Sequence, residues 1–199
     1  MRLLKKILRY LSLVILLVIA VYFLFLQRSY PLSVITRSFS VGDPVDSFNG
    51  ITVYSNGLEY DKSHGRHYSA DSFYYGKKWQ CVEYIKRYYH DRMEHKFPDG
   101  SGHAKEFFDA SLPQGGMNER RGLVQYRNGD KEKPQVNDIL VFGGKYGHVA
   151  IVSRVGEDEI EVVQQNIYLT PRETFALRNE NGRFFVGEGR EPLGWLRKK

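Results

Sequence analysis

The chain has 199 residues, a single cysteine and a formal net charge of +6, from 29 basic and 23 acidic residues. This length suits one globular domain with an appendage. One cysteine excludes an intramolecular disulfide scaffold and any zinc or iron–sulfur site built from several cysteines.

The positive charge is concentrated at the two ends of the chain. Eight basic residues lie there: Arg2, Lys5, Lys6, Arg9, Arg28, Arg197, Lys198 and Lys199. Between them, residues 29–196 hold 21 basic and 23 acidic residues, a net charge of −2. A domain that neutralises phosphates needs a local excess of Lys and Arg, so nucleic acid is not an expected partner.

Residues 10–26 form an uncharged apolar run in which Ser12 is the one polar residue. As a helix, the run would extend roughly 25 Å, at the short end of what spans a bilayer. Four cations precede it, and the positive-inside rule places them in the cytoplasm. We expect a cytoplasmic basic segment at 1–9, a transmembrane signal anchor at 10–26, a linker at 27–40 and a domain at 41–199 outside the cytoplasmic membrane, in the periplasm or the extracellular space.

A cleavable signal peptide is the alternative to a retained anchor. Its apolar core is usually 7–15 residues long and ends in a small-x-small cleavage site. The run here ends in Leu24-Phe25-Leu26-Gln27-Arg28, which offers no such site. The sequence therefore favours the retained anchor.

Elements of the domain follow in chain order. Residues 41–75 are rich in Gly, Ser, Asp and Tyr and hold one strand candidate, at 50–55. Apolar residues at three- and four-residue spacing predict a helix over 77–97, ended by Pro98-Asp99-Gly100. A weaker helical stretch follows at 104–111, and 113–135 is predicted as a long polar connection.

From residue 136 onward the pattern changes to strands. Apolar segments at 138–142, 148–152 and 160–164 are separated by turns rich in glycine and charged residues. One helix that precedes an antiparallel sheet predicts an α+β fold.

Cys81 lies in the first turn of the predicted long helix. Unpaired backbone N–H groups and the helix dipole stabilise a thiolate there, so we expect a lowered pKa and a nucleophilic sulfur. The alternative is a buried structural thiol, because free cysteine is among the most buried residue types.

His148 follows a glycine-rich turn and opens a strand, where an imidazole can take the proton of a thiol. Gln164 lies sixteen residues further on, in the predicted partner strand. A turn centred on Gly156 would place it opposite His148 on the same face, as the group that orients the imidazole. The other histidines form no closed set of ligands, so neither a metal site nor a cofactor is expected.

Together these residues resemble the CHAP domains, the cysteine- and histidine-dependent amidohydrolases and peptidases, and in particular the amidase domain of glutathionylspermidine synthetase/amidases. The resemblance covers roughly residues 41–196. The strings that carry it are Gly50-Ile51-Thr52-Val53-Tyr54-Ser55, Lys78-Trp79-Gln80-Cys81-Val82-Glu83-Tyr84, Gly147-His148-Val149-Ala150-Ile151-Val152, Gln164-Gln165-Asn166 and Leu193-Gly194-Trp195.

The resemblance implies a papain-like (NlpC/P60-type) cysteine hydrolase that cleaves an amide bond through a thioester. Cys81 is then the nucleophile, His148 the general base and Gln164 the orienting residue. It also assigns an oxyanion or substrate role to four further residues: Gln80, Asn166, Lys86 and Arg87. The family's string has glutamate where this chain has Gln164, and arginine where it has Lys86.

The substrate stays open between two amides. The resemblance favours a glutathione–polyamine conjugate such as glutathionylspermidine, whereas a domain outside the membrane meets peptidoglycan peptides. Because Gln164 is neutral, the alternative function is a catalytically weak module that binds peptides or polyamine conjugates in the same cleft.

Overall fold

The computed structural model describes residues 10–22, 39–167 and 170–199, which belong to two units, Met1–Ser38 and Phe39–Lys199. In the first unit, residues 10–22 are helical and exposed. The rest of the predicted anchor, residues 23–26, lies outside the described residues, as do 1–9 and 27–38. Among the described residues, no helix has the length and hydropathy needed to cross a membrane.

The second unit is an α+β domain built on one antiparallel sheet. Two small hairpins precede the sheet in sequence, β1 (Pro44–Phe48) with β2 (Ile51–Tyr54) and β3 (Arg66–Tyr68) with β4 (Tyr74–Lys77). The eight strands of the sheet are arranged in the order β11-β10-β9-β8-β7-β12-β6-β5. Their bounds are β5 Gly116–Asn118, β6 Leu123–Arg127, β7 Ile139–Phe142, β8 His148–Val155, β9 Glu159–Val163, β10 Arg172–Glu180, β11 Arg183–Val186 and β12 Pro192–Arg197.

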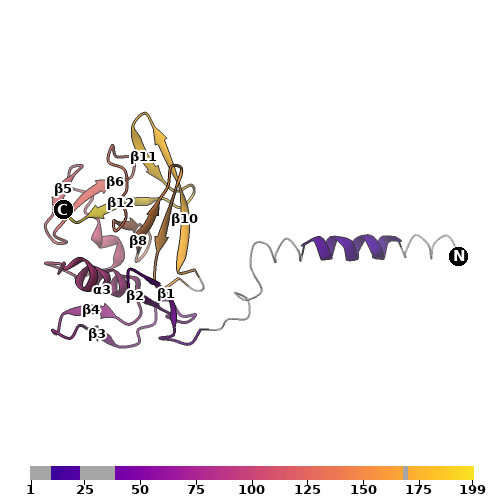
Figure 1. The fold of residues 1–199 in the computed structure, drawn as a ribbon, viewed down its shortest axis with the longest axis horizontal. Helices are drawn as coiled ribbons and strands as arrows, with labels where there is room; N and C mark the ends of the chain where they lie inside the picture. Colours follow the sequence, from indigo (N-terminus) through magenta and orange to yellow (C-terminus); the bar gives the residue numbers. More distant parts are fainter. Residues whose placement is uncertain (1–9, 23–38, 168–169) are drawn as a thin grey trace. The chain divides into compact units, whose positions relative to one another are not determined.

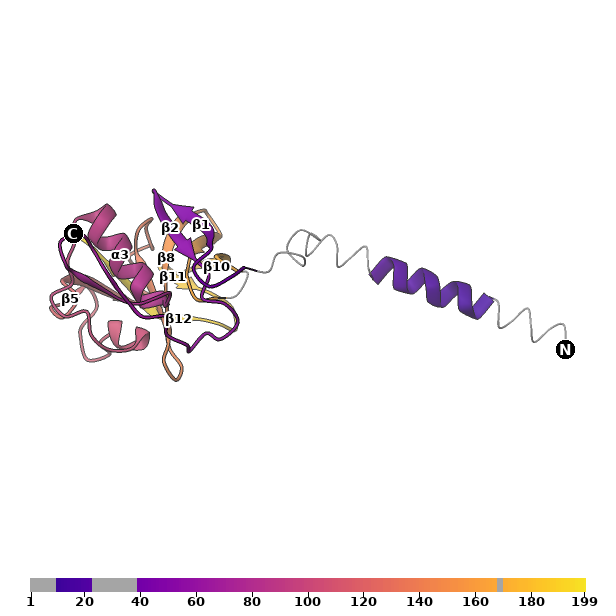
Figure 2. The ribbon, with the colours of Figure 1, turned by 90° about the horizontal axis from the view of Figure 1, so that it is seen from below.

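The long helix, α3, spans Cys81–Met93 and is shorter than predicted at both ends. Gln80 has extended backbone geometry, so the helix begins at the cysteine itself. Glu94 adopts the left-handed conformation (φ 50°) and donates its N–H to the Tyr89 carbonyl, which ends the helix before residues 94–97. Because α3 contacts β2, β4 and β8, most of its residues are buried (Figure 1 and Figure 2).

Two hydrophobic clusters cover the two faces of the sheet. One lies between α3 and the sheet and includes Val149, Ile151 and Val163. The other lies on the opposite face and includes Ala150 and Val162. The alternation along β8 and β9 is that of a sheet buried on both faces, which explains the continuous apolar runs in the sequence.

Two segments predicted to be irregular contain strands. The stretch 41–75 holds β1, β3 and part of β4 besides the predicted β2, and 113–135 holds β5 and β6. The segment at 104–111 forms only a short 3-10 helix, Ala104–Phe107, because Phe108 is already extended. β6 pairs with β12 near the end of the chain, and a strand of 5 residues with so distant a partner has no local sequence signal.

The register of β8 and β9 contains an irregularity. Near the turn Val155 pairs with Ile160, but beyond Ser153 the pairing shifts by one residue, and Val152 pairs with Val162. Ser153 is thus an extra residue in β8, a β-bulge. Its hydroxyl donates to the Glu161 carboxylate at 2.7 Å. The predicted turn centred on Gly156 is therefore wrong. It would have paired Val152 with Ile160, whereas Val152 pairs with Val162, two residues further along β9.

Candidate active site

A cleft of about 1310 Å³ opens where the first turn of α3 meets the first residue of β8. Cys81 and His148 both line it, together with parts of the segments 57–61, 74–77, 100–104 and 189–193. Its volume exceeds the roughly 300–1,000 Å³ of an ordinary small-molecule pocket. The cleft is therefore wide enough for an extended substrate.

Cys81 is 7% exposed, and the backbone groups of Val82 and Val149 act on its sulfur to lower the pKa. Val149 follows His148, so the thiol lies beside the start of β8. Burial raises the pKa of the Cys81 thiol to about 11, although the backbone N–H groups act to lower it. The expected lowering of this pKa is thus wrong, because removal of water from the sulfur outweighs the helix terminus.

His148 and Gln164 are joined by a hydrogen bond of 2.9 Å between the histidine Nε2 and the amide Oε1. The sequence predicted that His148 and Gln164 pair directly, whereas they lie diagonally: extended by one residue beyond the pair Ile151–Val163, the register places Ala150 opposite Gln164. Because the bulge at Ser153 shifts the register, the two side chains still lie on one face.

The orientation of the Gln164 amide follows from its other neighbours. Its Nε2 donates to the Thr170 carbonyl at 3.1 Å and to the Glu173 carboxylate at 3.0 Å. The oxygen of the amide must then face His148, whose Nε2 carries the donated proton. The other ring nitrogen, Nδ1, is left as the base. Burial lowers the pKa of His148 to about 4, and the charge of Arg190 acts in the same direction.

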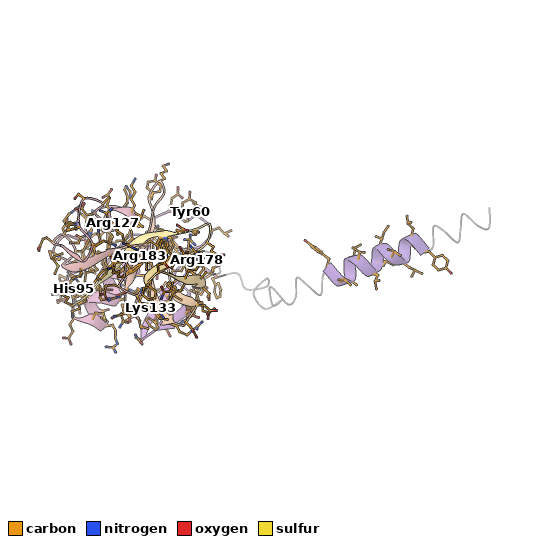
Figure 3. All side chains as sticks on the ribbon, turned by 90° about the horizontal axis from the view of Figure 1, so that it is seen from above. Tyr60, His95, Arg127, Lys133, Arg178 and Arg183 are labelled. Atoms are coloured by element: carbon orange, nitrogen blue, oxygen red, sulfur yellow. The ribbon has the colours of Figure 1, made fainter. Side chains whose placement is uncertain are left out.

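The side chains of Gln80 and Asn166 line the cleft but are held by the protein. Gln80 donates to the carbonyls of Tyr60 and Lys62, at 3.1 and 2.9 Å, and accepts from Asn166 at 2.8 Å. Asn166 also donates to the carbonyl of Tyr60, which Figure 3 labels at the surface of the domain. These amides fix the loop before Cys81, so an oxyanion role for the Gln80 side chain would require it to give up two hydrogen bonds.

Lys86 is a buried cation of the cleft wall. Its side chain is 4% exposed, and Nζ lies 5.2 Å from the ring centroids of both Phe73 and Tyr74. Burial and the nearby charge of Arg121 lower its pKa. Within the described part of the chain, no carboxylate forms an ion pair with this ammonium group, which fits it to an anionic group of a substrate.

The substrate role that the resemblance assigned to Arg87 is not supported by its surroundings. The guanidinium donates to the Glu83 carboxylate at 2.6 Å and to the Thr52 carbonyl at 2.9 Å. It lies 5.2 Å from the ring of Tyr54, and Arg87 is not among the described residues that line the cleft. Its charge is used inside the protein, to join α3 to β2.

Sequence reasoning missed two acidic residues beside the site. Glu83 is fully buried and accepts hydrogen bonds from Arg87 and from His67, whose Nδ1 lies 2.8 Å from its Oε1. The sequence showed only its i,i+4 spacing to Arg87. Glu173, on β10, gave no signal because nothing in the sequence indicated which strand lies beside β9. Over the described residues, no group of three or more His, Cys, Asp or Glu side chains is placed to hold a metal.

Comparison with known proteins gives a consistent result. Residues 71–166 match the family model described as CHAP domain. The chain is 27% identical over 136 residues to the bifunctional glutathionylspermidine synthetase/amidases of Escherichia coli (strain K12) and Shigella flexneri, covering 61% of this chain and 22% of each relative. It is also 27% identical over 120 residues to trypanothione synthetase of Crithidia fasciculata, covering 58% of this chain and 18% of that protein. The matched region spans about a fifth of the length of these relatives. The match to the family model confirms the resemblance to CHAP domains.

Proposed function

We propose that this CHAP-domain protein is a cysteine amidohydrolase in which Cys81 attacks an amide carbonyl and His148 moves the proton. The observation that carries the proposal is that Cys81 and His148 line the same cleft. Gln164 is hydrogen-bonded to Nε2 of His148, which leaves Nδ1 to act as the base. The α+β domain, with its helix beginning at Cys81, supports a papain-like arrangement.

The reaction follows from the resting protonation states. Both groups are neutral, so the thiol proton passes to Nδ1 of His148 as the sulfur–carbon bond forms. The backbone N–H of Cys81, in the first turn of α3, stabilises the resulting oxyanion. His148 then gives its proton to the leaving amine as the carbon–nitrogen bond breaks. Water then attacks the thioester carbonyl while His148 takes its proton. The carbon–sulfur bond breaks, His148 returns the proton to the Cys81 sulfur, and the carboxylic acid is released.

For the substrate, we propose an amide that carries a carboxylate near the scissile bond. The buried ammonium group of Lys86 supports this choice, because it lines the cleft and forms no ion pair with a carboxylate of the described residues. Two substrates fit: a glutathione–polyamine conjugate, supported by the names of the relatives, and a peptidoglycan peptide, supported by the predicted anchor.

The experiment that separates them uses the full chain purified in detergent micelles. Wild type and Cys81→Ala are incubated with glutathionylspermidine and with purified peptidoglycan, and released amines are quantified. We expect turnover of one substrate and its loss in the variant. If Cys81→Ala retains the wild-type rate, the nucleophile assignment is wrong.

A catalytically weak binding module is the second candidate, favoured by the neutral Gln164 and the raised pKa of the Cys81 thiol. In that case neither substrate is turned over by wild type, yet one of them binds. Isothermal titration with both compounds detects this outcome, and Lys86→Met should then weaken the binding.

We further propose that residues 10–26 anchor the protein in the cytoplasmic membrane with the domain outside. Support comes from the apolar run and from the cations that precede it. Carbonate extraction of membranes tests whether the protein is anchored, and protease treatment of intact cells or spheroplasts tests whether the domain lies outside. A domain that stays soluble, or that is protected in intact spheroplasts, would refute the proposal.

A further inference from the structure

Three polar side chains follow one another across β8, β9 and β10. His148 contacts Gln164 at 2.9 Å, and Gln164 contacts Glu173 at 3.0 Å. The strand registers explain this placement: extended one residue beyond Val163, they put Gln164 diagonal to His148 on one side and to Glu173 on the other. All three side chains therefore lie on one face of the sheet.

This arrangement gives Glu173 two effects on the base. An ionised carboxylate only accepts hydrogen bonds, so it requires the N–H₂ end of the Gln164 amide to face it. The amide oxygen must then accept from His148, which fixes the proton on Nε2 and leaves Nδ1 free. The carboxylate also places a negative charge near the imidazole, with only the Gln164 side chain between them.

We propose that Glu173 is a positioning residue that acts through Gln164, supplying from the neighbouring strand the negative charge that the family's glutamate carries at position 164. The inference rests on the proposed amide hydrolysis, and it explains how a neutral amide can take the place of an acid. Glu173 itself is not among the described residues that line the cleft, so it does not touch substrate.

Arg190 opposes Glu173 in its effect on the base. Its NH1 lies 2.8 and 3.0 Å from the two carboxylate oxygens, and its guanidinium carbon lies 4.7 Å from the ring centroid of Phe142. The carboxylate raises the pKa of His148, whereas burial and the arginine lower it. The Cys81 thiol, which lines the same cleft as His148, is neutral at rest because its pKa is raised to about 11.

Glu173 and Arg190 form one ion pair but change the pKa of His148 in opposite directions. Variants of the two residues therefore distinguish an electrostatic effect on His148 from the structural effect of losing the ion pair. We would label the full chain with [¹³Cε1]-histidine in micelles and assign the His148 signal by its loss in His148→Asn. Its titration is then followed in wild type, Glu173→Gln and Arg190→Gln. Glu180→Gln is the matched control, because Glu180 also lies on β10 and pairs with an arginine, Arg178, at 3.1 Å.

We expect the His148 titration midpoint to fall in Glu173→Gln and to rise in Arg190→Gln, each by about half a pH unit, and to stay unchanged in Glu180→Gln. Loss of a merely structural ion pair would move the midpoint in the same direction in both variants. That result, or no movement in Glu173→Gln, would overturn the proposal.

Kinetics provide a second measurement. In Glu173→Gln we expect kcat to fall about fivefold with little change in KM, and the acidic limb of the pH profile to move to lower pH. In the Gln164→Glu background two carboxylates face each other, so Glu173→Gln should there increase kcat. A further loss in that background contradicts the proposal. If wild type turns over no amide, the proposed function fails while the His148 titration still reports on Glu173.

Discussion

The buried carboxylate of Glu83 accepts a hydrogen bond of 2.7 Å from the side-chain amide of Gln165. These residues flank the two parts of the site, since Glu83 follows Cys81 and Gln165 follows Gln164. The same amide donates to the Gln80 carbonyl at 3.0 Å. The contact thus ties the start of α3 to the segment that holds the orienting residue.

Replacing Glu83 with glutamine should therefore destabilise the whole domain. The substitution leaves the Arg87 guanidinium buried without its carboxylate, and breaking a buried pair from one side costs about 3–5 kcal/mol. We expect this loss in chemical denaturation followed by fluorescence. Glu159→Gln, which breaks the exposed Arg154–Glu159 pair, is the control and should change stability little. Equal losses in both variants would contradict the assignment.

The Glu83 network also predicts how stability depends on pH. Burial acts to raise the pKa of Glu83, but the hydrogen bond from His67 and the charge of Arg87 hold it below its usual value. A lowered pKa in the folded state stabilises the domain above the unfolded pKa of about 4.3 and loses this contribution as the pH falls. The stability difference between wild type and Glu83→Gln should thus shrink below about pH 4. Denaturation midpoints measured from pH 7 to pH 3 test this, and a constant difference would refute it.

The resting thiol of Cys81 should react slowly with iodoacetamide at neutral pH. Its pKa is raised to about 11, and only the thiolate is the nucleophile. The thiolate fraction at pH 7 is then roughly 300-fold below that of free cysteine, only partly offset by the stronger nucleophilicity of a more basic thiolate, so we expect alkylation to be at least about tenfold slower and its rate to increase up to about pH 11. Mass spectrometry of the intact chain gives the rate, and the single cysteine makes the label unambiguous. Faster labelling than free cysteine at pH 7 would indicate a thiolate–imidazolium pair at rest.

Lys86→Met should weaken substrate binding and leave the fold intact. Methionine retains an unbranched side chain of similar length over the rings of Phe73 and Tyr74 but removes the charge. Since a hydrogen bond to a charged group contributes about 1.5–3 kcal/mol, KM for a carboxylate-bearing substrate should rise at least about tenfold. The control is Lys145→Met, because Lys145 also lines the cleft but is exposed. Equal effects of the two variants would remove Lys86 from substrate recognition.

The sequence was most informative where apolar runs are bounded by clear turns. β7, β8, β9 and the core of α3 were predicted for that reason, and with them the cleft wall that carries Cys81 and His148. Strand β1, the hairpin β3–β4 and the pair β5–β6 were missed, although β2 was predicted, because strands of 3–5 residues with partial burial have no periodicity to detect.

Side-chain contacts between strands could be predicted only as far as the register was known. The Cys81 pKa was predicted in the wrong direction because burial at the helix terminus depends on how α3 packs. Arg87 was assigned to substrate through the resemblance; its i,i+4 spacing to Glu83 was visible in the sequence, but the burial of this pair was not. The place of Glu173 beside Gln164 could not be predicted, because the sequence did not show that β10 pairs with β9.

The bulge at Ser153 has a consequence for comparisons among related hairpins. The pairs on either side of it, Val152 with Val162 and Arg154 with Glu161, would both survive deletion of Ser153, and the hairpin would then be regular. The number of residues between the base and its orienting partner can thus change by one while their contact is kept. A search that demands a fixed interval of sixteen between these two positions would pass over homologues with the same geometry.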